Sequence, residues 1–300
     1  MQRYMDKKLH RHKAYARCYV DDIVVFSKTF EEHIQHLRAV LGDLAETGMT
    51  LAPTKCYVGY HSIELLGHVV DRFGLSTMKQ KTDAIAALPF PKTLQELDYF
   101  LGLAGYYRFF VERFGYRANP LNRLKMELYR EAPRKNPARD QYSRSKRIVN
   151  PSDEAVKAFE EIKNALCAPP TLVHADTELP LIYYCDASVE RGFACAIHQV
   201  PRHVIEKHGL TEGDIINGNY DKKLEHPVMY LSQMLNRHEV NYWPTELEIA
   251  GIVWAIQKTR HLIKSSAIVK VFTDHSSVAD VLSTRSLKTS SSVQQNLRHV

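Results

Sequence analysis

The sequence predicts a multidomain protein of mixed α/β and α+β class. Its 300 residues are enough for about two domains. Two β-forming runs meet at Asp21-Asp22 and are followed by a well-signalled helix, which indicates a first α/β unit. A mostly helical stretch comes next, and residues 181–282 then have the order β-β-β-α-β-α, which indicates a second unit.

The composition is that of an ordinary globular chain, with 44% hydrophobic and 25% charged residues. A net charge of +6 favours a polyanionic partner, although a mildly basic enzyme has the same balance. The five cysteines form no Cys-x-x-Cys pair, so neither a disulfide framework nor a zinc site is expected. No signal peptide and no membrane-spanning run is apparent. We therefore expect an intracellular protein of the cytoplasm, the nucleus or both, with no membrane partner.

The stretch Tyr19-Val20-Asp21-Asp22 lies between Ala14–Cys18 and the apolar run Ile23–Phe26. Adjacent carboxylates at a tight bend, with β-formers on both sides, predict a hairpin that carries both acids at its tip. Two like charges side by side repel each other, and a divalent cation such as Mg²⁺ would relieve that repulsion. An ordinary Asp-Asp turn is the alternative interpretation.

Helices are predicted by capping residues and apolar spacing. Thr29 with Glu32 signals a start and Gly48 a stop. Further helices are expected from near Thr77 to residue 88, from Thr93 onward and over 150–168, with short strands over 49–75. The basic, proline-containing segment 125–150 is expected to be a flexible linker. Aromatic residues around Arg108, over 106–110, could clasp nucleic acid, but core packing is favoured.

The second half is predicted to alternate strands and helices. Strands are expected over 181–185, 192–199, 228–232 and 269–273, with a polar insertion at 200–226. A buried helix is expected over 245–262 and a short helix after His275, followed by a polar tail.

Three acids of this half stand at positions where strand ends and a buried helix would meet. Asp186 and Asp274 each end a predicted strand, and Glu248 is expected in the first turn of the buried helix. If the two strands are adjacent and parallel, the three carboxylates converge on one edge of the sheet. Such a cluster can hold two divalent ions for phosphodiester hydrolysis. Taken singly, each acid has an ordinary role as a turn or helix-end residue.

Several motifs occur in an order that resembles a known family: Tyr19–Asp22, Phe100–Arg108, Asp186–Ser188, Tyr242–Trp254 and Thr273–His275. The chain resembles the reverse transcriptase and RNase H region of a gypsy-type LTR retrotransposon polyprotein. The resemblance implies the second half of a polymerase palm over 1–75 and a helical thumb over 76–125. It further implies a connection over 126–178, in which a basic segment replaces the expected aromatic-rich sequence, and an RNase H-like domain lacking its end over 179–300.

The resemblance also implies roles for individual residues. Asp21 and Asp22 match the palm carboxylates that bind the catalytic Mg²⁺ or Mn²⁺ ions. Asp186, Glu248 and Asp274 match the RNase H metal ligands, with His275 as an auxiliary residue and Glu246 as a rival for the glutamate role. The residues expected to bind nucleic acid are Tyr19, Val20, Lys55, Gly67, His68 and Arg108.

The resemblance implies a further palm aspartate before Met1 and a fourth RNase H acid after Val300, on missing parts of the same polyprotein. We therefore expect a fragment of an RNA-directed DNA polymerase with RNase H that is inactive as a polymerase alone. Its expected partners are an RNA–DNA hybrid or a DNA duplex. Two alternatives stay open: a residual RNase H-type nuclease, and a non-catalytic nucleic-acid-binding remnant or domesticated element.

Overall fold

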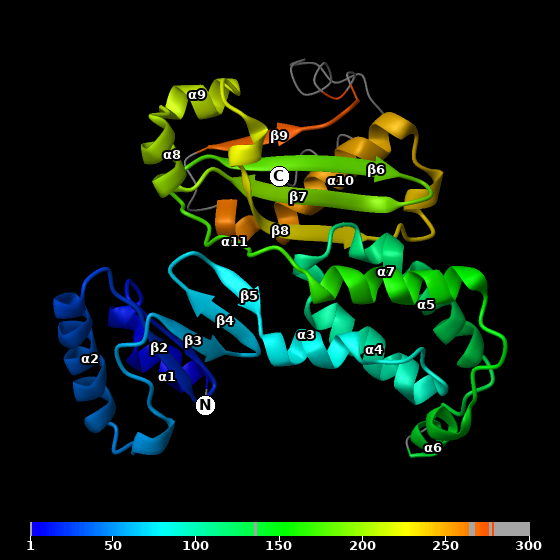
Figure 1. Cartoon of the computed structure of the whole chain (residues 1–300), viewed down its shortest axis with the longest axis horizontal. Helices are drawn as coiled ribbons and strands as arrows, with labels where there is room; N and C mark the ends of the chain where they lie inside the picture. The colour runs from blue at the N-terminus through cyan, green and yellow to red at the C-terminus, as the bar shows by residue number, and fades with distance from the viewer. Residues whose placement is uncertain (1, 135–136, 264–267, 276–277, 279–300) are drawn as a thin grey trace. The chain divides into compact units, whose positions relative to one another are not determined.

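The computed structural model describes residues 2–134, 137–263, 268–275 and 278 (Figure 1). The chain divides into two compact units, residues 1–63 and 64–300. Helices alternate with strands that form three separate sheets in the described part, so the predicted mixed class is confirmed. No helix within these ranges combines the length and the apolarity needed to cross a membrane.

The first unit is built on a β-hairpin and the helices that cover it. Its elements are α1 (Gln2–Lys8), η1 (His10–His12), β1 (Ala16–Tyr19), β2 (Asp22–Val25), α2 (Phe30–Ala45) and η2 (Pro53–Lys55). The predicted start of α2 is confirmed, because the Thr29 hydroxyl accepts the Glu32 N–H at 3.2 Å. A small core holds the unit together, formed by Met5, Leu9, Ala16, Val40 and Leu44.

The second unit begins with a three-stranded sheet of order β3-β4-β5. Its strands are β3 (Ser62–Leu65), β4 (His68–Asp71) and β5 (Leu75–Thr77), and α3 (Lys79–Ala86) follows. The helix predicted from near Thr77 is present, but Thr77 is not its cap, because Thr77 pairs with His68 in the β4–β5 ladder. A β-branched residue suits a strand better than a helix, and α3 starts two residues later with Met78 at its N-cap.

A helical segment follows in the same unit and has its own core. Its elements are α4 (Leu94–Tyr106), η3 (Arg108–Phe110), α5 (Phe114–Leu128), α6 (Ala138–Ser145) and α7 (Asp153–Cys167). The helices predicted from Thr93 and over 150–168 are confirmed, with the Thr93 and Ser152 side chains as N-caps. The core of the segment includes Leu97, Phe100, Leu121, Phe159 and Ile162.

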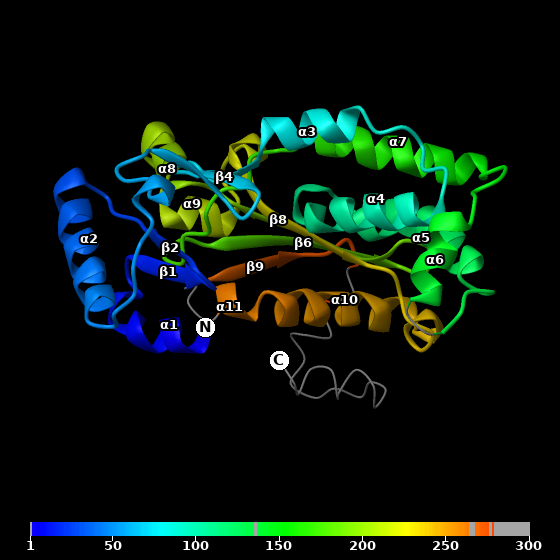
Figure 2. The same ribbon diagram turned by 90° about the horizontal axis from the view of Figure 1, so that it is seen from below.

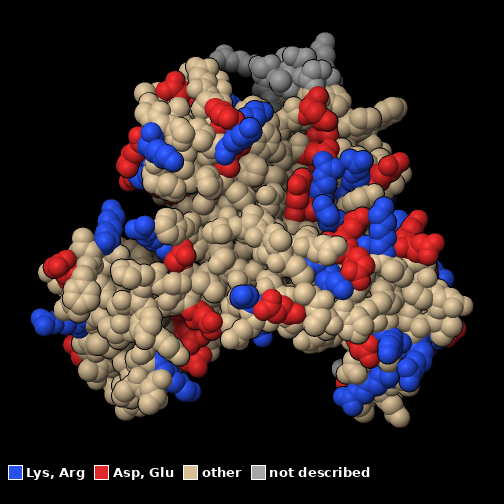
Figure 3. All heavy atoms as spheres, viewed as in Figure 1, with Lys and Arg blue, Asp and Glu red and all other residues tan. Residues whose placement is uncertain are grey.

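The basic segment expected as a flexible linker is ordered in its described part. It contains the end of α5 and all of α6, and then returns along the start of α4. The Leu94 N–H donates to the Lys146 carbonyl at 3.0 Å, and the Ile148 N–H donates to the Lys92 carbonyl at 2.9 Å. Figure 3 shows basic side chains gathered over α6. These backbone hydrogen bonds of the segment are thus made with α4 and its N-terminal flank, and its basic side chains face solvent. A composition with little apolar content did not predict this ordered structure.

The main sheet has four strands in the order β8-β7-β6-β9. Its strands are β6 (Leu181–Ser188), β7 (Gly192–Gln199), β8 (His226–Gln233) and β9 (Val269–Phe272). β6 is antiparallel to β7 and parallel to β9. The helix α10 (Pro244–Lys258) lies along one face, with η5 (Glu239–Asn241) before it and α11 (Arg260–Ile263) after it (Figure 2). The predicted order β-β-β-α-β is confirmed, and the helix expected after His275 lies outside the described residues.

Both faces of β6 are covered. Tyr183 and Cys185 pack in one core with Ile249, Ile252 and Val253 of α10. The alternate residue Ile182 packs in another core with Val204 and Ile215 of the 200–226 insertion. That insertion forms α8 (Arg202–His208), α9 (Glu212–Asn217) and η4 (Lys222–Leu224). Burial on both faces explains why β6 is a continuous apolar run and not an alternating one.

Candidate active site

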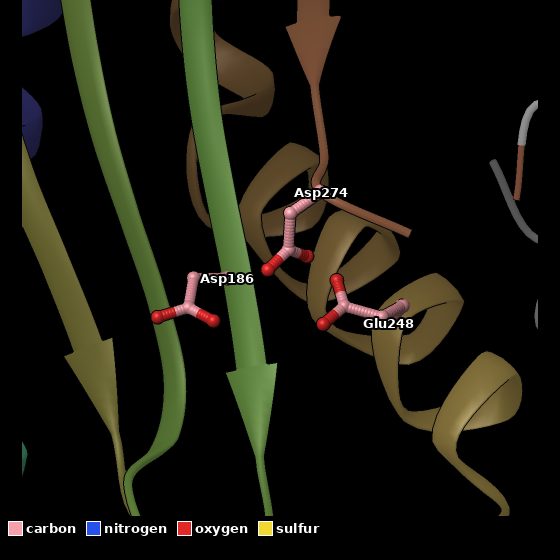
Figure 4. Close-up of side chains that lie close together, drawn as sticks. All are labelled: Asp186, Glu248 and Asp274. Carbon is pink, nitrogen blue, oxygen red and sulfur yellow. The ribbon is translucent and has the colours of Figure 1, made fainter. Parts of the chain in front are cut away.

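Three carboxylates meet beside the main sheet, and the strand register explains why. Asp186 belongs to β6, Asp274 follows β9, and Glu248 projects from α10 (Figure 4). Tyr184 and Phe272 pair in the parallel ladder, and Asp186 and Asp274 each come two residues later. One ligand oxygen from each of the three acids lies within 4.8 Å of the others. The convergence expected from the sequence is therefore present.

Glu248 is the most deeply buried member, with 5% of its surface exposed. Its Oε1 accepts the Ala187 N–H and its Oε2 accepts the Thr273 hydroxyl, both at 3.2 Å. Burial raises the pKa of Glu248, and the charges of Asp274 and Asp186 add to that rise against the opposing hydrogen bonds. The cluster is therefore a concentration of negative charge that a cation would stabilise.

A glycine lets α10 approach the sheet closely enough to deliver this carboxylate. Gly251 lies one turn beyond Glu248, and a Cβ there would stand 3.2 Å from both the Ala187 Cβ and the Phe193 ring. Glu248 is in the second turn of α10 and not the first, because the helix begins at Pro244. The rival Glu246 accepts the Trp243 N–H at 3.1 Å, as a residue at this position of a helix start commonly does.

Two neighbours complete the surroundings of the cluster. The Nη2 of Arg113 lies 2.8 Å from the Asp186 Oδ2, and nothing in the sequence pattern pointed to this residue. His275 follows Asp274, and its N–H donates to the Thr273 hydroxyl at 3.3 Å. The His275 Nδ1 is buried and has no hydrogen-bond partner among the described residues.

The other pair of acids lies at the tip of the predicted hairpin in the first unit. Tyr19 pairs with Asp22, so Val20 and Asp21 form a two-residue turn. Both acids are exposed. Val20 has a φ of 58°, which is unusual for a β-branched residue and shows that the turn is strained. In the described part of the chain, no third acid joins these two in a metal-ligating group.

Gln2 holds this strained turn and was not anticipated from the sequence. Its Oε1 accepts the Val20 N–H at 2.5 Å, and its Nε2 donates to the Cys18 carbonyl at 2.9 Å. One side chain thus bridges the last strand residues and the turn.

Comparison with protein families assigns both ends of the chain. Residues 1–70 match the family model of reverse transcriptase (RNA-dependent DNA polymerase). Residues 176–299 match the RNase H-like domain found in reverse transcriptase. The chain belongs to the reverse transcriptase/RNase H region of retrotransposon Pol polyproteins. The resemblance inferred from the motifs is thereby confirmed.

Individual relatives support this assignment along most of the chain. The chain is 28% identical to the Pol polyprotein of the Drosophila melanogaster transposon opus, over 95% of its own length and 26% of the relative. It is also 28% identical to the Pol polyprotein of the D. melanogaster transposon gypsy, over 86% of its own length and 22% of the relative. Its identity to the Schizosaccharomyces pombe Tf2-3 polyprotein is 25%, over 86% of this chain and 17% of the relative. The chain thus spans only a small part of each relative.

Solved structures support the fold. A foamy viral protease-reverse transcriptase solved with double-stranded DNA matches 99% of this chain and 46% of its own, at 22% identity and a TM-score of 0.70. The foamy viral protease-reverse transcriptase solved with an RNA/DNA hybrid matches over 99% of this chain and 35% of the viral chain, at 21% identity and a TM-score of 0.68.

Two of the residues expected to bind nucleic acid pack against the aromatic motif of this reverse transcriptase/RNase H region. Gly67 lies in the β3–β4 turn, and its carbonyl accepts the Tyr107 hydroxyl at 3.0 Å. The His68 ring stacks on the rings of Tyr106 and Phe110, with centroids 5.3 and 5.5 Å away. Burial lowers the pKa of His68. The structure therefore gives both residues a packing role, and their contact with nucleic acid stays a prediction.

Tyr19, Lys55 and Arg108 are exposed. Arg108 lines a hollow of ≈ 490 Å³ in the second unit, together with β8, Trp254, Lys258 and His261. The predicted core role of the aromatic motif is confirmed for Tyr107 and Phe110, which are 2% and 4% exposed, and is wrong for Tyr106 and Phe109, which are 50% and 37% exposed.

Proposed function

We propose that the second unit cleaves RNA in an RNA–DNA hybrid with divalent metal ions held by Asp186, Glu248 and Asp274. The observation that carries this proposal is the convergence of the three carboxylates to within 4.8 Å. The RNase H-like match over 176–299 supports it. So does the fold shared with a foamy viral enzyme that was solved with an RNA/DNA hybrid.

The donor set fits Mg²⁺ or Mn²⁺, because three carboxylates supply hard oxygen ligands. Burial raises the pKa of Glu248, and the charges of Asp274 and Asp186 raise it further, so a bound cation would stabilise its ionised form. Bound metal would activate water and stabilise the leaving oxygen. The protein's part is to hold the ligands: Glu248 through its two hydrogen bonds, and the two aspartates through the paired strands β6 and β9.

The polymerase part of the proposal concerns the hairpin acids. Asp21 and Asp22 would bind metal at a palm site, with Tyr19 and Val20 beside the primer end. Because no third acid joins them in the described residues, this chain alone should not clamp two metals for nucleotide transfer. We expect no primer extension with Mg²⁺ or Mn²⁺. Templated extension that disappears on Asp21→Asn would overturn this expectation.

The experiment for the nuclease uses the full chain and a labelled RNA–DNA hybrid. With Mn²⁺ or Mg²⁺ we expect cleavage of the RNA strand, reduced by about 100-fold or more in Asp186→Asn, Glu248→Gln and Asp274→Asn. Matched controls are Asp83→Asn and Glu190→Gln, which change exposed acids outside the cluster and should leave the rate unchanged. Cleavage that survives all three cluster substitutions would exclude this site.

The second candidate function is non-catalytic binding of nucleic acid. The hollow lined by Arg108, Lys258 and His261 favours it, because cations and aromatic rings share one surface and no acid lines it. Fluorescence anisotropy of a hybrid in Ca²⁺ at two salt concentrations tests it. We expect affinity to fall with salt, and Arg108→Gln to weaken binding and flatten the salt dependence. An affinity independent of salt would exclude binding through phosphate contacts.

A further inference from the structure

The acid cluster pairs with one cation among the described residues, and that cation comes from the helical segment. The Nη2 of Arg113 lies 2.8 Å from the Asp186 Oδ2. About a third of each side chain is exposed, so the pair lies at the rim of the site. In the part of the chain that is described, this is the ion pair of the cluster with a Lys or Arg, and neither Glu248 nor Asp274 takes part in it.

The backbone around Arg113 is fixed against the main sheet. Arg113 is the N-cap of α5 and has a φ of 54°, a left-handed conformation that an arginine does not prefer. Two residues later the Gly115 N–H donates to the Ser232 hydroxyl of β8 at 2.7 Å. A Cβ on Gly115 would lie 3.3 Å from the Gln233 backbone nitrogen, so the two backbones are in close contact. Docking of α5 on β8 thus places the guanidinium beside Asp186.

We propose that Arg113 is the internal counterion of the metal site: it pairs with Asp186 in the metal-free chain and opposes the binding of a divalent cation. This inference rests on the proposed metal-binding role of the cluster. Arg113 is a positioning residue here, because it acts through Asp186. The helical segment thereby sets the metal affinity of the RNase H-like segment.

Charge determines the direction of the effect. In the metal-free state the guanidinium stabilises the Asp186 carboxylate, and this contact weakens when a metal takes the carboxylate. A guanidinium that stays within roughly 5 Å of a divalent ion also repels it, by about tenfold in affinity in water before salt screening. Both effects favour the metal-free state. The opposing benefit, a carboxylate held in one orientation, is smaller because the pair is partly exposed.

The test measures metal binding without any reaction. Mn²⁺ is titrated into the full chain and free Mn²⁺ is followed by electron paramagnetic resonance at low ionic strength. We expect Arg113→Gln to bind Mn²⁺ about three- to tenfold more tightly than the parent chain, with the difference shrinking as salt increases. Arg113→Lys, which keeps the charge, should stay close to the parent. The matched control is Arg117→Gln on the same helix, whose partner is Glu161 and not the cluster.

A second variant guards against a folding defect. Arg113→Gly removes the side chain and suits the left-handed backbone, so it should fold at least as well and show the same tighter binding. Unchanged or weaker Mn²⁺ binding in both variants would overturn the counterion role while leaving the metal site intact. If neither the parent nor the variants bind Mn²⁺ in an Asp186-dependent way, the proposed function fails and the counterion role fails with it. Binding seen only in the variants would support the inference most strongly.

Discussion

Glu225 is expected to be a main support of the insertion between β7 and β8, and its replacement by glutamine measures that support. The Glu225 side chain is 4% exposed. Its Oε1 accepts the Tyr184 hydroxyl at 2.9 Å and the Tyr220 hydroxyl at 2.8 Å, and its Oε2 lies 3.3 Å from the His198 Nδ1. These contacts join two strands of the sheet, β6 and β7, to the insertion around one charge.

The magnitude follows from the bonds to that charge. Hydrogen bonds to an ionised acceptor contribute about 1.5–3 kcal/mol each, against about 0.5–1.5 kcal/mol for a neutral pair. Glu225→Gln keeps the size and one acceptor oxygen, so it should lower the free energy of unfolding by about 2 kcal/mol at pH 7. The matched control Glu190→Gln changes an exposed glutamate and should be within about 0.5 kcal/mol of the parent.

The pH dependence has a definite sign. Burial alone would raise the pKa of Glu225, but the contacts with His198, Tyr220 and Tyr184 outweigh burial and lower it. A lowered carboxyl pKa in the folded state contributes stability that is present above the unfolded value of 4.5 and is lost as pH falls through the folded value. The difference between Glu225→Gln and the parent should therefore be full at pH 7 and shrink below about pH 4.5.

The assay is urea unfolding of both chains at pH 7 and pH 4, followed by tyrosine fluorescence. An equal loss at both pH values would contradict the role assigned to the ionised carboxylate. No loss at pH 7 would show that the two tyrosine hydroxyls find other partners.

Two further substitutions test the backbone and the core. Gly192→Ala places a Cβ 2.2 Å from the Gln233 carbonyl oxygen at a φ of 76°, and should destabilise the chain by about 3 kcal/mol or more in a thermal melt, whereas Gly42→Ala, with open space around it, should not. Phe159→Ala removes a fully buried ring from the helical core and should cost about 3–5 kcal/mol by urea titration. Phe30→Ala, at a ring that is 65% exposed, is the control, and an equal loss there would contradict the assigned burial.

Local sequence signals predicted the parts of the structure that depend on local physics. The hairpin with Asp21 and Asp22 follows from β-forming runs around a tight bend, and the α2 start follows from Thr29. The meeting of Asp186 and Asp274 was predictable because parallel strands carry equivalent positions to the same level. Thr77 shows the limit of such signals, because a residue with the pattern of a helix cap is paired in a β-strand instead.

Contacts between distant segments were not predictable. Arg113 reaches Asp186 because α5 docks on β8, and no spacing in the sequence encodes that docking. Gln2 supports the Val20 turn for the same kind of reason. The packing of the polar insertion 200–226 against the sheet was not predicted either, because only a few of its residues, such as Val204 and Ile215, contribute to the core.

The covering of β6 from both sides limits how this protein can be shortened. Joining β7 directly to β8 by a tight turn would preserve the ladder and all three cluster acids, since none of them belongs to the 200–226 stretch. It would nevertheless leave Ile182 and its apolar neighbours facing water on the side away from α10. A chain shortened in this way would expose an apolar surface and be prone to self-association, so a minimal version of the RNase H-like segment has to retain the 200–226 insertion as part of its hydrophobic core.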